Sequence, residues 1–189
     1  MRIGNINSLF INDAAKALYE RWTSLPRLEN QLCPKRLELN FGGLPTRFKK
    51  HSFLLTNLEE GVLTASDIGA EITDFLGEKL DGQNLTDRHG DNQMKYEVPY
   101  YDAVFSTPCA GVLVRRTINK KGTHADFVSC HLPLLDYQNK VRYLLGVVQI
   151  TNIESTENSG SPINLHSSQV VDRVLIDIGA GLPDMTFDE

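Results

Sequence analysis

The chain has 189 residues, of which 41% are hydrophobic and 23% are charged, and its net charge at pH 7 is −5. These values are typical of one globular domain, and they argue against broad nucleic-acid binding, which requires a basic surface. No stretch approaches the about 20 apolar residues of a membrane-spanning helix, and the first ten residues do not resemble a secretory signal. The three cysteines have neither disulfide nor metal-site spacing, so the composition predicts a soluble, cytoplasmic protein with reduced thiols.

An amphipathic helix is predicted near the N-terminus. Ala14, Leu18 and Trp22 recur every four residues after an Asn-Asp pair that can cap a helix. This apolar stripe either covers the chain's own sheet or pairs with the same helix of a second subunit. Because an isologous dimer is the commonest oligomer, we expect Ala14, Leu18 and Trp22 to form a homodimer interface.

The middle of the chain predicts a hairpin followed by helices. Residues 53–58 and 62–68 are apolar and flank a Glu-Glu-Gly turn, which is typical of two paired strands. Residues 70–76 predict a short helix that ends at a glycine. A second helix is expected from residue 91, with a break or a new start at Pro99 because proline removes a helical hydrogen bond.

Three consecutive segments give the clearest signal in the sequence. Residues 110–118, 125–135 and 141–153 alternate in a two-residue period, and short polar turns separate them. This pattern predicts an antiparallel meander with one buried face. The predicted fold is therefore α+β, with a five-stranded antiparallel sheet, a helical insertion between the second and third strands, and an N-terminal helix.

The predicted organisation has three parts. Residues 1–50 contain the N-terminal helix and an irregular lead-in, and residues 51–153 form the core. Residues 154–189 begin with a Ser/Asn/Thr/Gly-rich linker and continue into a last apolar segment at residues 170–178. That segment is expected to dock on the core or on a partner.

The sequence resembles the PAS family, in particular stand-alone alphaproteobacterial members that carry a helix before the core. The resemblance rests on the order of short motifs across residues 14–151. These are Trp22, Leu32-Cys33-Pro34-Lys35-Arg36, Ile68-Gly69, Phe75-Leu76-Gly77, Leu80-Asp81-Gly82-Gln83-Asn84, Leu132-Pro133-Leu134 and Leu144-Leu145-Gly146. The second strand lacks the arginine and aromatic residues expected there. The resemblance implies a five-stranded sheet under a helical segment, and a sensory or adaptor role in signal transduction.

Candidate ligand contacts lie where the helical segment would face the sheet. We expect an apolar small molecule to be lined by Phe75, Tyr101, Phe105, Val114, Cys130, Leu132 and Val148. Whether this space is open or filled by side chains stays undecided in the sequence, since protein interiors are densely packed by default.

No catalytic, metal or cofactor site is predicted. Cys130 and His131 are neighbours on a strand and point to opposite faces, so they cannot form a nucleophile–base pair, and no paired zinc-ligand spacing is present. The turn Gly82-Gln83-Asn84-Leu85 lacks the cysteine of photochemical flavin domains, and residues 94–107 contain no histidine for haem.

The predicted function is a bacterial sensory or adaptor protein that binds a small ligand, a signalling partner or both, without catalysis. Two alternatives stay open. One is a small hydrolase or isomerase working in the same cavity, and the other is an adaptor that binds no ligand. Catalysis would be indicated by a buried acid or base with a strongly shifted pKa.

Overall fold

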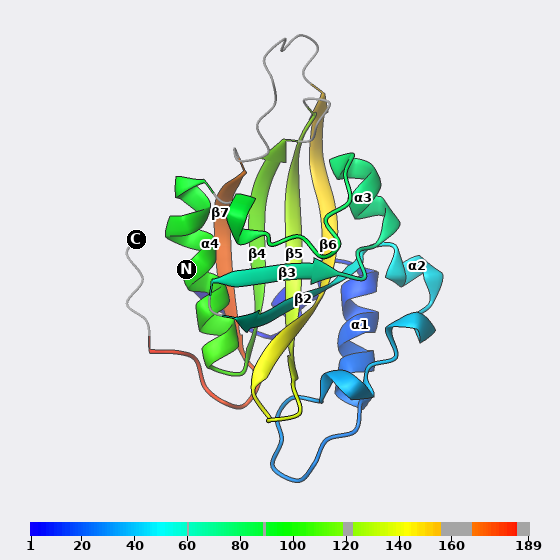
Figure 1. Cartoon of the computed structure of the whole chain (residues 1–189), viewed down its shortest axis with the longest axis vertical. Helices are drawn as coiled ribbons and strands as arrows, with labels where there is room; N and C mark the ends of the chain where they lie inside the picture. The colour runs from blue at the N-terminus through cyan, green and yellow to red at the C-terminus, as the bar shows by residue number, and fades with distance from the viewer. Residues whose placement is uncertain (60, 89, 119–122, 156–167, 185–189) are drawn as a thin grey trace.

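A computed structural model describes residues 1–59, 61–88, 90–118, 123–155 and 168–184 (Figure 1). Its described strands form one seven-stranded sheet in the order β1-β7-β4-β5-β6-β2-β3. The prediction of a five-stranded antiparallel PAS-like sheet is therefore wrong: the sheet is larger, and one of its strand pairs is parallel.

The two extra strands come from the ends of the chain. β7 (Gln169–Asp177) pairs antiparallel with β4 (Cys109–Ile118), and β1 (Arg2–Gly4) then adds parallel to β7. The last apolar segment is thus an interior strand of the sheet. Most of the predicted linker, residues 156–167, lies outside the described residues.

The remaining strands occupy the segments in which the sequence predicted them. β2 (Ser52–Glu59) and β3 (Val62–Ser66) form a hairpin, and β5 (Thr123–Leu135) and β6 (Val141–Ser155) continue the meander from β4. β2 pairs with β6, which joins the hairpin to the meander. In Figure 1, β2 and β3 cross in front of β4, β5 and β6.

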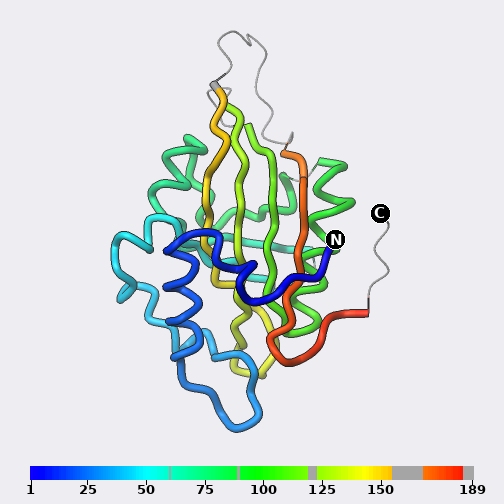
Figure 2. The backbone as a smooth tube through the Cα atoms, turned by 180° about the vertical axis from the view of Figure 1, so that it is seen from behind, coloured from blue at the N-terminus to red at the C-terminus, as the bar shows by residue number. Residues whose placement is uncertain are grey.

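Helices cover both faces of the sheet. α3 (Ala70–Leu76) and α4 (Asp91–Ser106) lie on the face seen in Figure 1, and α1 (Asp13–Ser24) lies on the opposite face, which Figure 2 shows. We call these the α4 face and the α1 face. The expectation of one buried face is wrong, because residues 129–135 of β5 are buried without a break, as in sheets covered on both sides.

α1 begins and packs as its sequence predicts. The Asn12 side chain accepts a hydrogen bond from the Ala15 amide (2.8 Å), which caps the helix. Trp22 donates its indole N–H to the Pro133 carbonyl of β5 (2.8 Å). The helix is therefore held to its own sheet by both apolar contact and a buried hydrogen bond.

α4 is a continuous helix that contains Pro99, so the predicted break is wrong. Proline cannot donate to the carbonyl four residues earlier, which normally weakens a helix interior. Here both halves of α4 are buried along one side, from Gln93 and Glu97 to Tyr100 and Val104. This packing holds the two halves in line and outweighs the lost hydrogen bond.

Short helices complete the chain between the main elements. These are α2 (Thr46–Lys49) and the 3₁₀ helices η1 (Ile6–Leu9), η2 (Arg36–Glu38), η3 (Phe41–Gly43) and η4 (Thr86–Arg88). No helix in the described part of the chain is long and apolar enough to cross a membrane.

Candidate functional site

A cavity of about 140 Å³ lies between the α4 face of the sheet and the segment that contains α3, η4 and α4. Its walls come from β2 to β6, from α3, η4 and α4, and from the segments between them. They comprise Phe53, Leu55, Ala65, Ile68, Ile72, Leu76, Glu78, Leu80, Leu85, Arg88, Gln93, Glu97, Tyr101, Arg115, Thr117, Phe127, Val148 and Ser168. An engineered apolar cavity of about this volume accommodates benzene, so the space suits a molecule of roughly six heavy atoms.

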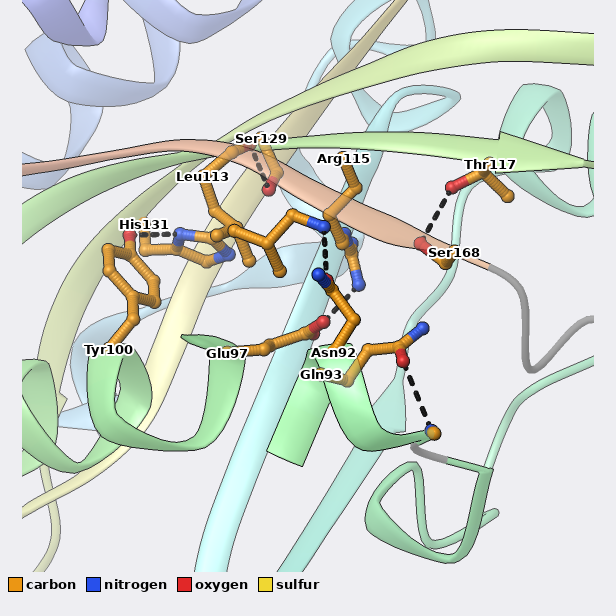
Figure 3. A network of polar contacts seen from close by, with 12 residues as sticks. Asn92, Gln93, Glu97, Tyr100, Leu113, Arg115, Thr117, Ser129, His131 and Ser168 are labelled. Carbon is orange, nitrogen blue, oxygen red and sulfur yellow. Dashed lines mark hydrogen bonds and ion pairs between the residues drawn. The ribbon is translucent and has the colours of Figure 1, made fainter. Parts of the chain in front are cut away.

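An ion pair with a buried carboxylate forms part of the cavity wall (Figure 3). Arg115 of β4 donates from Nη1 to Oε1 of Glu97 on α4 at 2.9 Å, and the Glu97 side chain is only 2% exposed. Burial alone would lower the pKa of Arg115, but the Glu97 carboxylate and the Tyr101 and Tyr100 hydroxyls raise it overall. The guanidinium, whose side chain is 23% exposed, therefore stays charged.

One donor of this pair is unused within the protein. Arg115 Nε is buried and has no hydrogen-bond partner among the described residues. A buried donor without a partner costs on the order of 1–3 kcal/mol.

The other polar groups of the wall are engaged with the protein. Arg88 pairs with Glu78 at 2.5 Å, and the Gln93 side-chain oxygen accepts from the Gly90 amide at 3.1 Å. Thr117 and Ser168 share a hydrogen bond of 3.2 Å (Figure 3). Apart from Tyr101, the rest of the wall is apolar.

A second polar pair lies on the same face. The Tyr100 hydroxyl and His131 Nδ1 are 2.8 Å apart, and both side chains are fully buried (Figure 3). Burial, together with the charge of Arg115, lowers the pKa of His131 from 6.5 to about 3, and burial raises that of Tyr100. Gly111 makes room for this pair, because a Cβ there would come within 2.3 Å of the Tyr100 hydroxyl.

Two of the seven predicted ligand contacts, Tyr101 and Val148, line the cavity. Val114, Cys130 and Leu132 point to the α1 face instead. Each is next in sequence to Arg115 or His131, which point to the α4 face, and neighbouring residues of a strand point to opposite faces. These three residues therefore lie across the sheet from the cavity, and both faces of β4 and β5 are apolar.

The last two predicted contacts lie in other hollows. Phe75 lines a wider groove of about 860 Å³ beside α1 and α2, and its ring contacts that of Phe127, which does line the cavity (5.2 Å between centroids). Phe105 lines a third hollow next to Pro108.

The predicted dimer residues are buried within the single chain. Ala14, Leu18 and Trp22 are 6%, 1% and 4% exposed. Their side chains therefore leave little surface for a second subunit, and the oligomeric state stays a prediction.

Glu97 and Arg115 are not among the site residues predicted from the sequence. A signal for both was present: Gln93, Glu97 and Tyr101 share a four-residue spacing on one side of α4. Arg115 and Arg116 are adjacent in an apolar strand, so one of them had to point to the α4 face.

The cysteines and potential metal ligands do not gather at this site. Burial raises the pKa of Cys33, Cys109 and Cys130 to about 12 in each case, so their thiols stay protonated at neutral pH. The part of the chain that the structure describes contains no cluster of three or more His, Cys, Asp or Glu side chains suited to a metal.

No protein-family model matches the sequence, and no curated protein matches it.

Proposed function

We propose that this chain binds a small molecule in the α4-face cavity and acts by binding, without catalysis, in a sensory or adaptor role. The observation that carries the proposal is the cavity itself, in which the Arg115–Glu97 ion pair lies beside apolar walls. Ligand pockets commonly combine apolar walls with a few placed polar groups. The resemblance to PAS motifs adds the sensory or adaptor role to the same proposal.

A shift in conformational population would couple the ligand to a surface signal. Arg115 belongs to the sheet and Glu97 to α4, so a molecule that contacts Arg115 favours one packing of the helix on the sheet. Two hydrogen bonds also join α4 to β7. The Val170 amide donates to Asn92 Oδ1 (2.7 Å), and Arg173 Nη1 donates to the Tyr96 carbonyl (3.0 Å). A movement of α4 would therefore reach the strand that lies beside β1.

Binding is favoured over catalysis by the state of the buried ionisable groups. His131 has a pKa of about 3, which makes it a weak base at neutral pH, and it does not line the cavity. A general base works best with a pKa near the working pH.

Native mass spectrometry of freshly purified protein tests the proposal. The wild type should retain a non-covalent small molecule, and Ala65→Leu, which places a larger side chain in the cavity, should lose it. Ala65→Leu should also keep or raise thermal stability because it fills space.

Ala103→Leu is the matched control. Ala103 is equally buried but does not line the cavity, so the extra atoms should cost about 1–3 kcal/mol of stability while the molecule is retained. A wild type without a bound molecule, combined with an Ala65→Leu variant as destabilised as Ala103→Leu, would contradict the proposal.

A further inference from the structure

The second half of β6 has an open edge. β2 pairs with β6 only from Tyr143 to Val147, and the sheet order gives β6 no other described neighbour on that side. The Val148 amide donates to the His51 carbonyl (2.9 Å), and the residues after it run beyond the start of β2 (Figure 2). Alternate residues of an antiparallel strand direct their backbone groups to the same side, so Ile150 directs its N–H and C=O to this open edge.

These two backbone groups are available to another strand. Among the described residues, neither has a hydrogen-bond partner on that side, and Ile150 is partly exposed. The regular edge ends soon afterwards, because Asn152 has a left-handed backbone (φ 50°) and the pairing of β5 with β6 shifts register there. An unpaired edge is a template for strand addition, so an added strand can pair over a few residues around Ile150.

The open edge forms one wall of the groove of about 860 Å³ that contains Phe75. Gln149, Ile150 and Ile153 line it from β6, and Ile153 is 60% exposed. The other walls come from the start of α1, from α2 and from α3. We call this the β6-edge groove. No residue lines both this groove and the α4-face cavity, so the two are separate sites.

The β6-edge groove has an excess of negative charge. Asp13 of α1 and Asp74 of α3 line it, are exposed, and have no ion pair among the described residues. The third carboxylate, that of Glu71, is already bonded to two basic side chains. Arg47 is the one lysine or arginine among the described lining residues. Opposite charges across an interface favour encounter and fix orientation, so the groove favours a basic partner.

A second copy of the chain fits this edge less well than a basic segment does. A symmetric pairing of two β6 strands would bring Asp13 and Asp74 of both copies to the same edge. Each copy also has a net charge of −5. Like charges brought together at an interface are unfavourable, which argues against self-association here.

We propose that the β6-edge groove binds an extended segment of another protein, which adds to β6 as a strand at Ile150 and contains lysine or arginine among apolar residues. Its backbone bonds to Ile150, its apolar side chains contact Phe75 and Ile153, and its basic side chains pair with the two free carboxylates. Because α1 and α3 cover opposite faces of the sheet, these basic side chains lie on both sides of the added strand. This surface goes beyond the small-molecule site, because it gives the chain a place to contact a protein partner.

A blocked hexapeptide, acetyl-Val-Lys-Val-Val-Lys-Val-amide, tests the proposal. Its two lysines are three positions apart and therefore point to opposite sides of an extended strand. The peptide is titrated into ¹⁵N-labelled full-length protein, and the amides of Gln149 and Ile150 are followed, with the Val174 amide as a reference outside the groove. The peptide should shift the two groove amides saturably, and it should slow hydrogen exchange at Ile150.

Two altered peptides separate the contacts. One carries N-methyl groups on its two central valines, so it loses the N–H that faces the Ile150 carbonyl in either register. It should bind at least about tenfold more weakly. The other has glutamate in place of both lysines, and it should bind at least about fivefold more weakly because it places like charges beside Asp13 and Asp74.

Variants of the protein test the same contacts from the other side. Asp13→Asn combined with Asp74→Asn should weaken binding of the lysine peptide about fivefold. Glu29→Gln combined with Asp184→Asn is the matched control, because it also removes two exposed carboxylates but neither lines the groove. Ile150→Pro removes the N–H at the open edge, a position where a strand tolerates proline, and it should abolish binding.

Each outcome decides one part of the proposal. No saturable shift with the lysine peptide would overturn it as a whole. Equal binding of the N-methylated peptide would rule out strand addition, and equal binding of the glutamate peptide would rule out the preference for a basic segment. A wild type that sediments as a dimer, and an Ile150→Pro variant that sediments as a monomer, would assign the edge to a second copy instead. None of these results bears on the α4-face cavity, which the retained small molecule tests.

Discussion

Arg115 and Arg116 are neighbours in β4 with opposite surroundings. Arg115 points to the α4 face and pairs with Glu97, which is 2% exposed, whereas Arg116 points to the α1 face and pairs with Asp126 near the surface. The alternation of a β-strand places them on different faces. Two identical side chains therefore have different roles, one within the cavity wall and the other at the rim of the sheet.

The buried His131 predicts a pH-dependent stability. Burial lowers its folded-state pKa from 6.5 to about 3, so between these values the unfolded chain binds a proton that the folded chain does not. The free energy of unfolding should therefore fall as the pH is lowered from 6.5, by up to about 1.4 kcal/mol per pH unit.

The window from pH 6.5 to 4.5 isolates this histidine. The lowered pKa values of Glu71 and Asp126 also favour the folded state, but that contribution is lost only below their ordinary values of 4.5 and 3.8. Urea titrations across the window should show a smaller slope for His131→Phe than for the wild type. Equal slopes would mean that His131 is accessible to protons in the folded chain.

At the scale of elements, α1 covers the β5–β6 part of one sheet face, and η1 contacts β4 and β7. Its stripe of Ala14, Leu18 and Trp22 is buried, and the Trp22 indole donates to the Pro133 carbonyl at 2.8 Å. Arg27 lies over the same indole ring at 4.6 Å and donates to the Trp22 carbonyl. The helix thus supplies the second apolar layer that the α1 face of the sheet needs.

Trp22→Ala should be strongly destabilising. Removing a buried indole from a core costs about 3–5 kcal/mol, and Trp22→Phe should cost less because most of the ring is kept. For each variant, the fall in melting temperature should not depend on protein concentration, since the ring packs on its own chain.

Leu37→Ala is the control for Trp22, because Leu37 is 84% exposed and its loss should change stability by no more than about 0.5 kcal/mol. A melting temperature that rises with protein concentration in the wild type but not in Trp22→Ala would instead place the indole between subunits.

For the whole molecule, the two ends of the chain complete the sheet. β1 and β7 are separated by more than 160 residues, yet Arg2 pairs with Val174 in the parallel register and Arg2 also contacts Asp172 through a salt bridge of 2.7 Å. Val174 itself is 1% exposed. Residues near both ends therefore belong to the same folding unit as the central strands.

Val174→Thr tests this contribution of the C-terminal strand. A hydroxyl at a buried site without a designed partner should cost about 1–3 kcal/mol. The same change at Val171, which is 63% exposed in the same strand, should be nearly neutral. Chemical denaturation of both variants provides the comparison, and equal stabilities would indicate that β7 is not part of the cooperative core.

The sequence alone determined the local elements. The strand segments in residues 53–68 and 110–153 and the helices at residues 13–24 and 70–76 follow from periodicity, capping and turn residues. These signals are local, because each depends on neighbours a few positions apart. A continuous α4 could not be predicted in this way, since packing along its buried side overrides the local effect of Pro99.

Only the tertiary structure decided which face each strand presents and which distant groups meet. Both faces of the sheet are buried, so the apolar pattern does not distinguish the cavity side from the α1 side, and five of the seven predicted ligand contacts lie outside the cavity. Arg115 and Glu97 are 18 residues apart, and Tyr100 and His131 are 31 apart. Their pairing depends on how α4 crosses the sheet, and no local spacing in the sequence encodes that crossing.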